Sequence, residues 1–182
     1  MGRRGRSILD GQANTFFVTT TFVDFARILS FGKMYSEILR DSLKYVLTKY
    51  SVKLFGYVFM PSHIHLVIYI PEGQSISSLM RDFKKYTSTR IRQQLEMDGH
   101  EDWIEKLRRN AAGQKQLFKL WMDRFDDVVI RSDRVMKSKI NYIHLNPVRA
   151  GLVDEAEDWE YSSARFYAGK PDDFLPVSSG WL

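Results

Sequence analysis

Two histidines separated by one residue, His63 and His65, are the first feature of this sequence that could do chemistry. They lie in a run of aliphatic residues, and on a β-strand residues i and i+2 project from the same face. Ile64, Leu66 and Ile68 alternate with them and are expected to face the core. The two imidazoles therefore share the opposite face, within reach of one divalent ion. An exposed pair on a solvated strand is the alternative that this pattern leaves open.

A second candidate pair, Tyr142 and Asn146, is spaced four residues apart and so shares one face of a helix. An asparagine amide oxygen is a hard ligand that suits Mg²⁺ or Mn²⁺. A tyrosine beside a metal-held phosphate can attack phosphorus and form a covalent adduct. A divalent ion would favour ionisation of the phenol and polarise a phosphate oxygen. An ordinary half-buried helix aromatic is the alternative for Tyr142.

The order of the predicted elements indicates how these side chains are positioned. The sequence predicts a strand at 15–23, a helix at 33–50, antiparallel strands at 54–60 and 63–70, a helix from Ser75 to about Met97, a loop or ragged helix at 100–116, strand-like pieces at 117–122 and 127–130, and a helix from Ser132 or Asp133 to near Asn146. The order β-α-β-β-α-β followed by a helix is the α+β, ferredoxin-like split-βαβ pattern, an antiparallel sheet with two helices on one face. The final helix is free to cover or border the other face.

Positive charge is concentrated in residues 1–149, which hold 25 basic and 15 acidic side chains, whereas residues 150–182 hold 2 and 7. A basic body with an acidic C-terminal tail favours a polyanionic partner, although solubility alone explains the same balance. The candidate phosphate contacts fall in a basic arm (1–14), along one predicted basic face of the second helix, and in the segment that follows it. They are Arg3, Arg4, Arg6, Arg81, Lys84, Lys85, Arg92, Lys106, Arg108 and Arg109.

The length and composition of the 182 residues exclude several classes of protein. The length fits a single domain spanning 1–182. The absence of cysteine excludes disulfide scaffolds, Cys-ligated zinc fingers, iron–sulfur clusters and thiol nucleophiles. No apolar run approaches the ~20 residues that span a bilayer, and no signal peptide is visible. We therefore expect a cytoplasmic protein with no membrane partner.

Two segments carry a family resemblance: YVFMPSHIHLVI (57–68) and NYIHLNPVRAGLV (141–153). They resemble the signature segments of single-tyrosine HUH transposases (IS200-like), and are most similar to the REP-associated tyrosine transposase branch. LWMDRFDDVVIRSD (120–133) and DWEYSSARFY (158–167) are similar to further segments of that family, in the expected order. One departure is Val128, where many relatives carry a histidine after the aspartate at the position of Asp127.

The resemblance implies a metal-dependent endonuclease and strand transferase acting on single-stranded DNA, often at hairpins. By matching position, Tyr142 would be the nucleophile that forms a 5′-phosphotyrosine and frees a 3′-OH. His63 and His65, with Asn146 as third ligand, would hold Mg²⁺ or Mn²⁺. The relatives include homodimers that exchange the tyrosine helix as well as monomers, and both states stay open. Binding to DNA would place the protein at the bacterial nucleoid.

Three other functions compete with this interpretation. A two-histidine phosphoesterase needs two separate His-x-Ser/Thr strands, and this chain has one paired strand without the Ser/Thr. A catalytically retired, ferredoxin-like nucleic-acid-binding protein predicts that the substitution Tyr142→Phe changes nothing measurable. A retired transposase would keep the site and act as a DNA-binding or repair accessory.

Overall fold

The computed structural model describes residues 14–113, 117–171 and 173–180. The candidate phosphate contacts Arg3, Arg4 and Arg6 lie outside these residues. The helices within the described part of the chain are each too short or too polar to cross a membrane.

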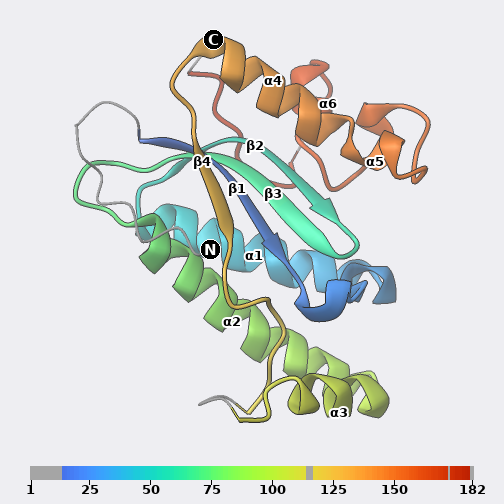
Figure 1. The fold of residues 1–182 in the computed structure, drawn as a ribbon. Helices are drawn as coiled ribbons and strands as arrows, with labels where there is room; N and C mark the ends of the chain where they lie inside the picture. The colour runs from blue at the N-terminus through green and yellow to red at the C-terminus, as the bar shows by residue number, and fades with distance from the viewer. Residues whose placement is uncertain (1–13, 114–116, 172, 181–182) are drawn as a thin grey trace.

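A four-stranded antiparallel sheet forms the centre of the fold (Figure 1). Its strands are β1 (Thr15–Thr21), β2 (Lys53–Met60), β3 (His63–Tyr69) and β4 (Asp126–Val129), in the spatial order β2-β3-β1-β4. The turn Pro61-Ser62 joins β2 to β3, and β1 pairs with both β3 and β4. This order is the ferredoxin-like one, so the predicted fold class is confirmed.

Two long helices cover one face of the sheet (Figure 1). They are α1 (Lys33–Lys49) and α2 (Ile76–Met97), and the Ser75 side chain caps α2 by accepting a hydrogen bond from the Ser78 backbone N–H. Ile64 and Leu66 of β3 are fully buried in the core between this face and the helices. Alternation then places His63 and His65 on the other face, as predicted.

The second face is covered by α4 (Asp133–His144), whose Met136, Ile140 and Ile143 pack on Phe17 and Val67 in a second apolar cluster. Ser132 caps this helix, accepting from the Val135 backbone N–H. The remaining helices are the 3₁₀ turns η1 (Val23–Phe25), η2 (Ile28–Phe31) and η3 (Ala156–Asp158), and α3 (Glu101–Arg109), α5 (Asn146–Arg149) and α6 (Ala164–Tyr167).

Gly56 of β2 allows α4 to approach the sheet closely. A Cβ atom at this position would lie 2.5 Å from Ile140 Cδ1 and 2.9 Å from Ile143 Cδ1. We expect the substitution Gly56→Ala to lower the free energy of unfolding by about 1–3 kcal/mol through overpacking. Adding Ile140→Val, which removes the nearer methyl group, should recover part of that loss in urea unfolding. Strictly additive destabilisation by the two changes would contradict this packing.

The C-terminal segment follows the outer edge of β2. The Phe59 N–H donates to Tyr161 O at 2.8 Å, Ser163 N–H to Tyr57 O at 3.0 Å, and Ser178 N–H to Leu54 O at 2.8 Å. An unpaired strand edge is a template for pairing with another chain, and here the chain's own acidic tail occupies it.

Two predicted segments differ from the structure. Residues 101–109 form a regular helix, α3, because Ile104 and Leu107 are buried against the core as one apolar stripe. The strand predicted at 117–122 is absent apart from an isolated bridge between Trp121 and Phe22. Its apolar residues serve packing instead, since Leu120 and Trp121 are buried in the core.

Candidate active site

His63 and His65 lie side by side on β3, with ring centroids 4.8 Å apart. His65 is only 4% exposed, so the alternative of an exposed, solvated pair is wrong. Burial, with smaller contributions from His63 and Lys139, lowers the pKa of His65 to about 3. Burial also lowers the pKa of His63. Both imidazoles are therefore neutral at neutral pH, the form that can bind a metal ion.

The hydrogen bonds of the two rings leave one nitrogen of His65 without a partner. His65 Nδ1 shares a hydrogen bond with Thr19 Oγ1 at 2.8 Å, and His63 Nδ1 shares one with Ser62 Oγ at 3.1 Å. His65 Nε2 is buried and has no hydrogen-bond partner among the described residues. A metal-ligating histidine is commonly held through one nitrogen and binds the ion through the other. This orphaned nitrogen fits such a role.

Tyr142 extends from α4 to the histidine pair. Its ring centroid lies 5.5 Å from that of His65 and 5.9 Å from that of Phe17. The side chain is 40% exposed, so a substrate can reach it. The structure thus brings the candidate nucleophile and the histidine pair together within one chain.

Asn146 stands one helical turn after Tyr142, at the first residue of α5. Its side-chain Nδ2 is buried and has no hydrogen-bond partner among the described residues. No hydrogen bond in the described part of the chain joins Asn146 to either histidine. Within the same residues no group of three or more His, Cys, Asp or Glu side chains could hold an ion. Further ligands for an ion at His63 and His65 would therefore come from other oxygens, such as those of an amide, a phosphate or water.

Two cations beside Tyr142 are absent from the sequence-based candidates. Lys139 Nζ lies 4.4 Å from the Phe17 ring centroid and 5.8 Å from that of Tyr142. Arg149 Cζ lies 5.8 Å from the Tyr142 centroid. Their spacings of −3 and +7 from the tyrosine place both on its helical face, a signal present in the sequence.

His144 helps to fix α4 on the sheet. Its Nε2 shares a hydrogen bond with Ser163 Oγ at 2.9 Å. The same Ser163 hydroxyl donates to Tyr57 O and accepts from the Tyr57 N–H, both on β2. This network connects α4, β2 and the C-terminal segment. This hydrogen-bond network could not be predicted from the sequence, because its members are far apart in the chain.

Burial lowers the pKa of His144 to about 4, which predicts a pH-dependent stability. Between pH ~6.5 and ~4 the unfolded chain binds a proton that the folded chain does not. The free energy of unfolding should therefore fall by about 2–3 kcal/mol as the pH drops through this window. In urea unfolding at pH 7, 5.5 and 4.5, His144→Gln should show a shallower loss than the wild type. Equal slopes for the two proteins would contradict a buried, neutral His144.

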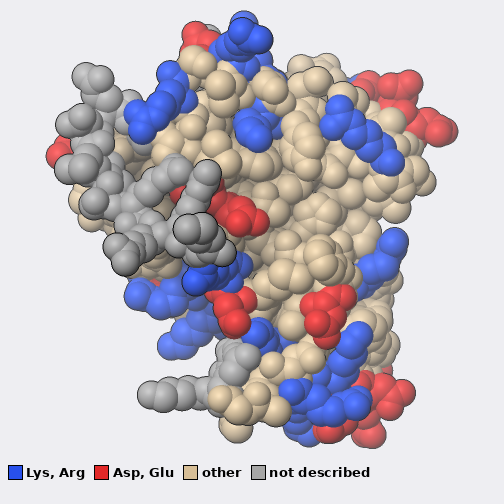
Figure 2. Space-filling view, in the orientation of Figure 1, with Lys and Arg blue, Asp and Glu red and all other residues tan. Residues whose placement is uncertain are grey.

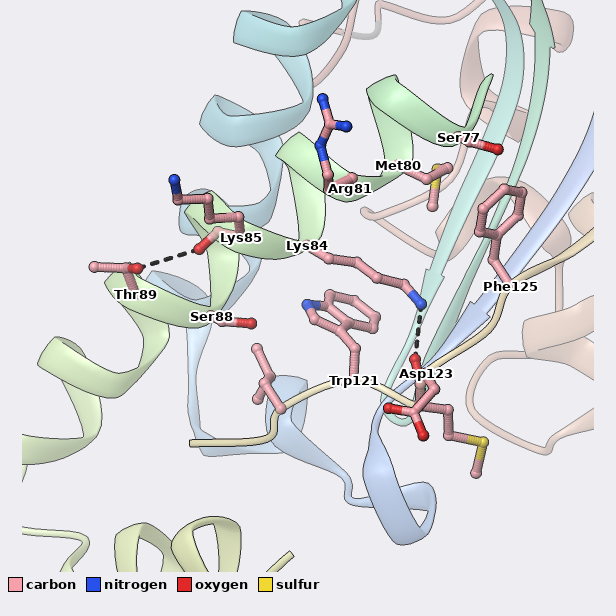
Figure 3. Close-up of a pocket in the computed structure, with 12 residues that line it drawn as sticks. Ser77, Met80, Arg81, Lys84, Lys85, Ser88, Thr89, Trp121, Asp123 and Phe125 are labelled. Carbon is pink, nitrogen blue, oxygen red and sulfur yellow. Dashed lines mark hydrogen bonds between the residues drawn. The ribbon is translucent and has the colours of Figure 1, made fainter. Parts of the chain in front are cut away.

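The basic face predicted along α2 is interrupted at Lys84. Figure 3 shows this side of α2 facing the segment 120–125 across a groove. The volume of this groove is about 470 Å³. Lys84 Nζ donates to Met122 O at 2.8 Å and Arg124 O at 3.0 Å. Burial lowers the pKa of Lys84 to about 8. The basic face expected along α2 is therefore not continuous, because the chain returning from α3 covers Lys84. The role of Lys84 in DNA binding stays a prediction.

The other described basic candidates are on the surface or near it. Figure 2 shows Lys and Arg in separate patches over α2, α3 and α4 rather than in one stripe. Arg81, Lys85 and Arg108 are exposed, Arg92 pairs with Glu96, Arg109 pairs with Glu105, and Lys106 lies over the Trp103 ring. None of these contacts prevents an approach of phosphate, and their role in DNA binding stays a prediction.

The known proteins that are similar to this chain include several transposases. The chain is 26% identical over 152 residues to a Haemophilus influenzae protein named "Putative REP-associated tyrosine transposase", covering 84% of this chain and 80% of that protein. It is 28% identical over 128 residues to the REP-associated tyrosine transposase of Escherichia coli K12, covering 70% and 63%. A solved structure of a REP-associated tyrosine transposase bound to a REP hairpin aligns with a TM-score of 0.67 at 23% identity, covering 98% of this chain and 96% of the other.

The solved structure supports the fold. The family comparison also identifies the family to which the chain belongs. The family described as "Transposase IS200 like" matches residues 20–144, which is more than half of the chain and includes the histidine pair and Tyr142. The predicted enzyme class, a tyrosine transposase, is therefore confirmed. The chain belongs to the IS200-like transposase family.

Proposed function

We propose that this protein cuts and rejoins single-stranded DNA through a covalent 5′-phosphotyrosine at Tyr142. The observation that carries the proposal is the 5.5 Å separation between the Tyr142 and His65 rings in one chain. The accessible phenol and the orphaned His65 Nε2 support it. The site is borne on a strand and a helix packed together, and such elements hold functional groups more accurately than loops do.

We further propose that His63, His65 and Asn146 hold a divalent ion, Mg²⁺ or Mn²⁺. Two neutral imidazoles and an amide oxygen form a mixed donor set, and the buried, unpartnered Nε2 of His65 is an atom that could bind the ion. When bound, such an ion polarises a non-bridging phosphate oxygen and orients the scissile phosphate. Thr19 keeps the His65 ring in the orientation that directs Nε2 away from its hydrogen-bonded side.

The reaction needs a nucleophile aligned with the leaving group. Tyr142 Oη attacks the scissile phosphorus, and its proton passes to solvent, which reaches this partly exposed side chain. As the Tyr142 O–P bond forms, the bond from phosphorus to the 3′ oxygen breaks, and that oxygen takes up a proton. The 5′-phosphate stays on the enzyme. Attack by a second 3′-OH on this phosphotyrosine reverses the step and joins the strands.

For the substrate we propose single-stranded DNA that contains a hairpin, as the solved relative is bound to a REP hairpin. The exposed cations of α2 and α3, together with the arm outside the described residues, would contact the backbone. Each neutralised phosphate of a single strand contributes about −0.7 to the slope of log affinity against log salt. Such a partner would place the protein at the nucleoid.

The test is a covalent-adduct assay with a hairpin-bearing single-stranded oligonucleotide and Mn²⁺. The wild type should yield a protein–DNA adduct that survives denaturation and is lost on chelation. Tyr142→Phe should form none, whereas Tyr86→Phe, a change in α2, should form as much as the wild type. An adduct that persists in Tyr142→Phe would overturn the assignment of the nucleophile and make Tyr86 the first suspect.

A further inference from the structure

Lys139 and Arg149 flank the ring of Tyr142 without an ion pair among the described residues. Many other cations on the helices do have carboxylate partners, such as Arg92 with Glu96 and Lys49 with Asp82. Lys139 is half-buried and lies against the Phe17 and Tyr142 rings, and Arg149 is exposed two helical turns after Tyr142. Two cations that face one nucleophile and lack a carboxylate are positioned to bind an anion there.

Their placement follows from the helical repeat. Lys139, Tyr142, Asn146 and Arg149 stand at positions i, i+3, i+7 and i+10, and the chain continues from α4 into α5 with helical hydrogen bonds from Arg149 N–H to Leu145 O. Residues with these spacings share one face of a helix. That face is the one turned toward the histidine pair, since the Tyr142 ring contacts His65.

We propose that Lys139 and Arg149 bind the non-bridging oxygens of the scissile phosphate, with Lys139 acting as a catalytic residue. This inference rests on the proposed function. A phosphodiester carries one negative charge, and attack by the phenol increases the charge on its oxygens in the transition state. A fixed cation therefore stabilises the transition state more than the bound substrate. The half-buried Lys139 should contribute more than the solvated Arg149, because solvent weakens charge interactions.

The test compares rate with affinity in four variants. Lys139→Met keeps the apolar stem that packs on Phe17 and removes the charge. We expect single-turnover adduct formation to slow by about 100-fold. Affinity for the same oligonucleotide is measured with Tyr142→Phe added to prevent cleavage, and it should change little. The slope of log affinity against log salt concentration should become shallower by about 0.7. Lys139→Arg should restore most of the rate, and Arg149→Met should slow it by about tenfold.

Lys137→Met is the matched control, since it removes the same charge from an exposed position of the same helix. Its rate should equal that of the wild type. A Lys139→Met enzyme as fast as the wild type would overturn this proposal, as would equal losses of rate and affinity or an equal slowing by Lys137→Met. The wild-type adduct separates the two proposals: if the wild type forms none, the proposed function itself has failed.

Discussion

Replacing His65 with alanine is expected to slow adduct formation by about 1000-fold or more while changing DNA affinity only a few-fold. His65 Nε2 is the buried, unpartnered atom at the site, and a metal ion at such a position supplies several kcal/mol of transition-state stabilisation. Single-turnover cleavage and filter binding of the same hairpin oligonucleotide, both in Mn²⁺, measure the two quantities.

Thr19→Val tests the same metal-ligand role of His65 with a smaller expected loss of rate. It removes the hydroxyl that orients His65 Nδ1 and keeps the branched shape of the side chain. Loss of a group that orients a metal ligand typically costs 10–100-fold, so the expected rate lies between those of the wild type and His65→Ala. Equal losses of cleavage and binding in His65→Ala would contradict its role as a ligand and indicate a structural histidine.

The second large effect concerns complementation between two defective variants. Tyr142→Phe is expected to form no adduct and His65→Ala to form it about 1000-fold more slowly than the wild type, and their mixture should do no better than His65→Ala alone. The reason is that Tyr142 and His65 meet within one chain, with α4 packed on its own sheet through Met136, Ile140 and Ile143. The C-terminal segment also covers the β2 edge.

The mixed sample should be compared with wild-type protein at the same total concentration, after co-refolding so that subunits can exchange. Substantial recovery of adduct in the mixture would show that one chain supplies the tyrosine to the histidines of another. That result would contradict a site built by a single chain.

Local periodicity accounts for what could be predicted from the sequence. The alternation of Ile64 and Leu66 with the histidines indicated which face of β3 they occupy, and the structure bears this out. The fold followed from the order of such elements, because a two-residue turn and helical crossovers allow few arrangements.

Contacts between distant segments account for what could not be predicted. The segment 120–125 covers Lys84, so this one position on the basic face of α2 is half-buried while Arg81 and Lys85 stay exposed. Ser163 reaches His144 and Tyr57 across the second face. Lys139 and Arg149 carried the correct spacing, but only packing against the sheet shows that their face is the one beside the histidines.

The most direct test of the account is to map the attachment site of DNA in the trapped adduct. Trypsin releases residues 140–149 as one peptide, and Tyr142 is its single tyrosine. After nuclease trimming, mass spectrometry should find a 5′-linked nucleotide on this peptide, with fragment ions that place it on Tyr142. A nucleotide attached to any other peptide, or through a 3′-phosphate, would contradict the proposed chemistry of the site.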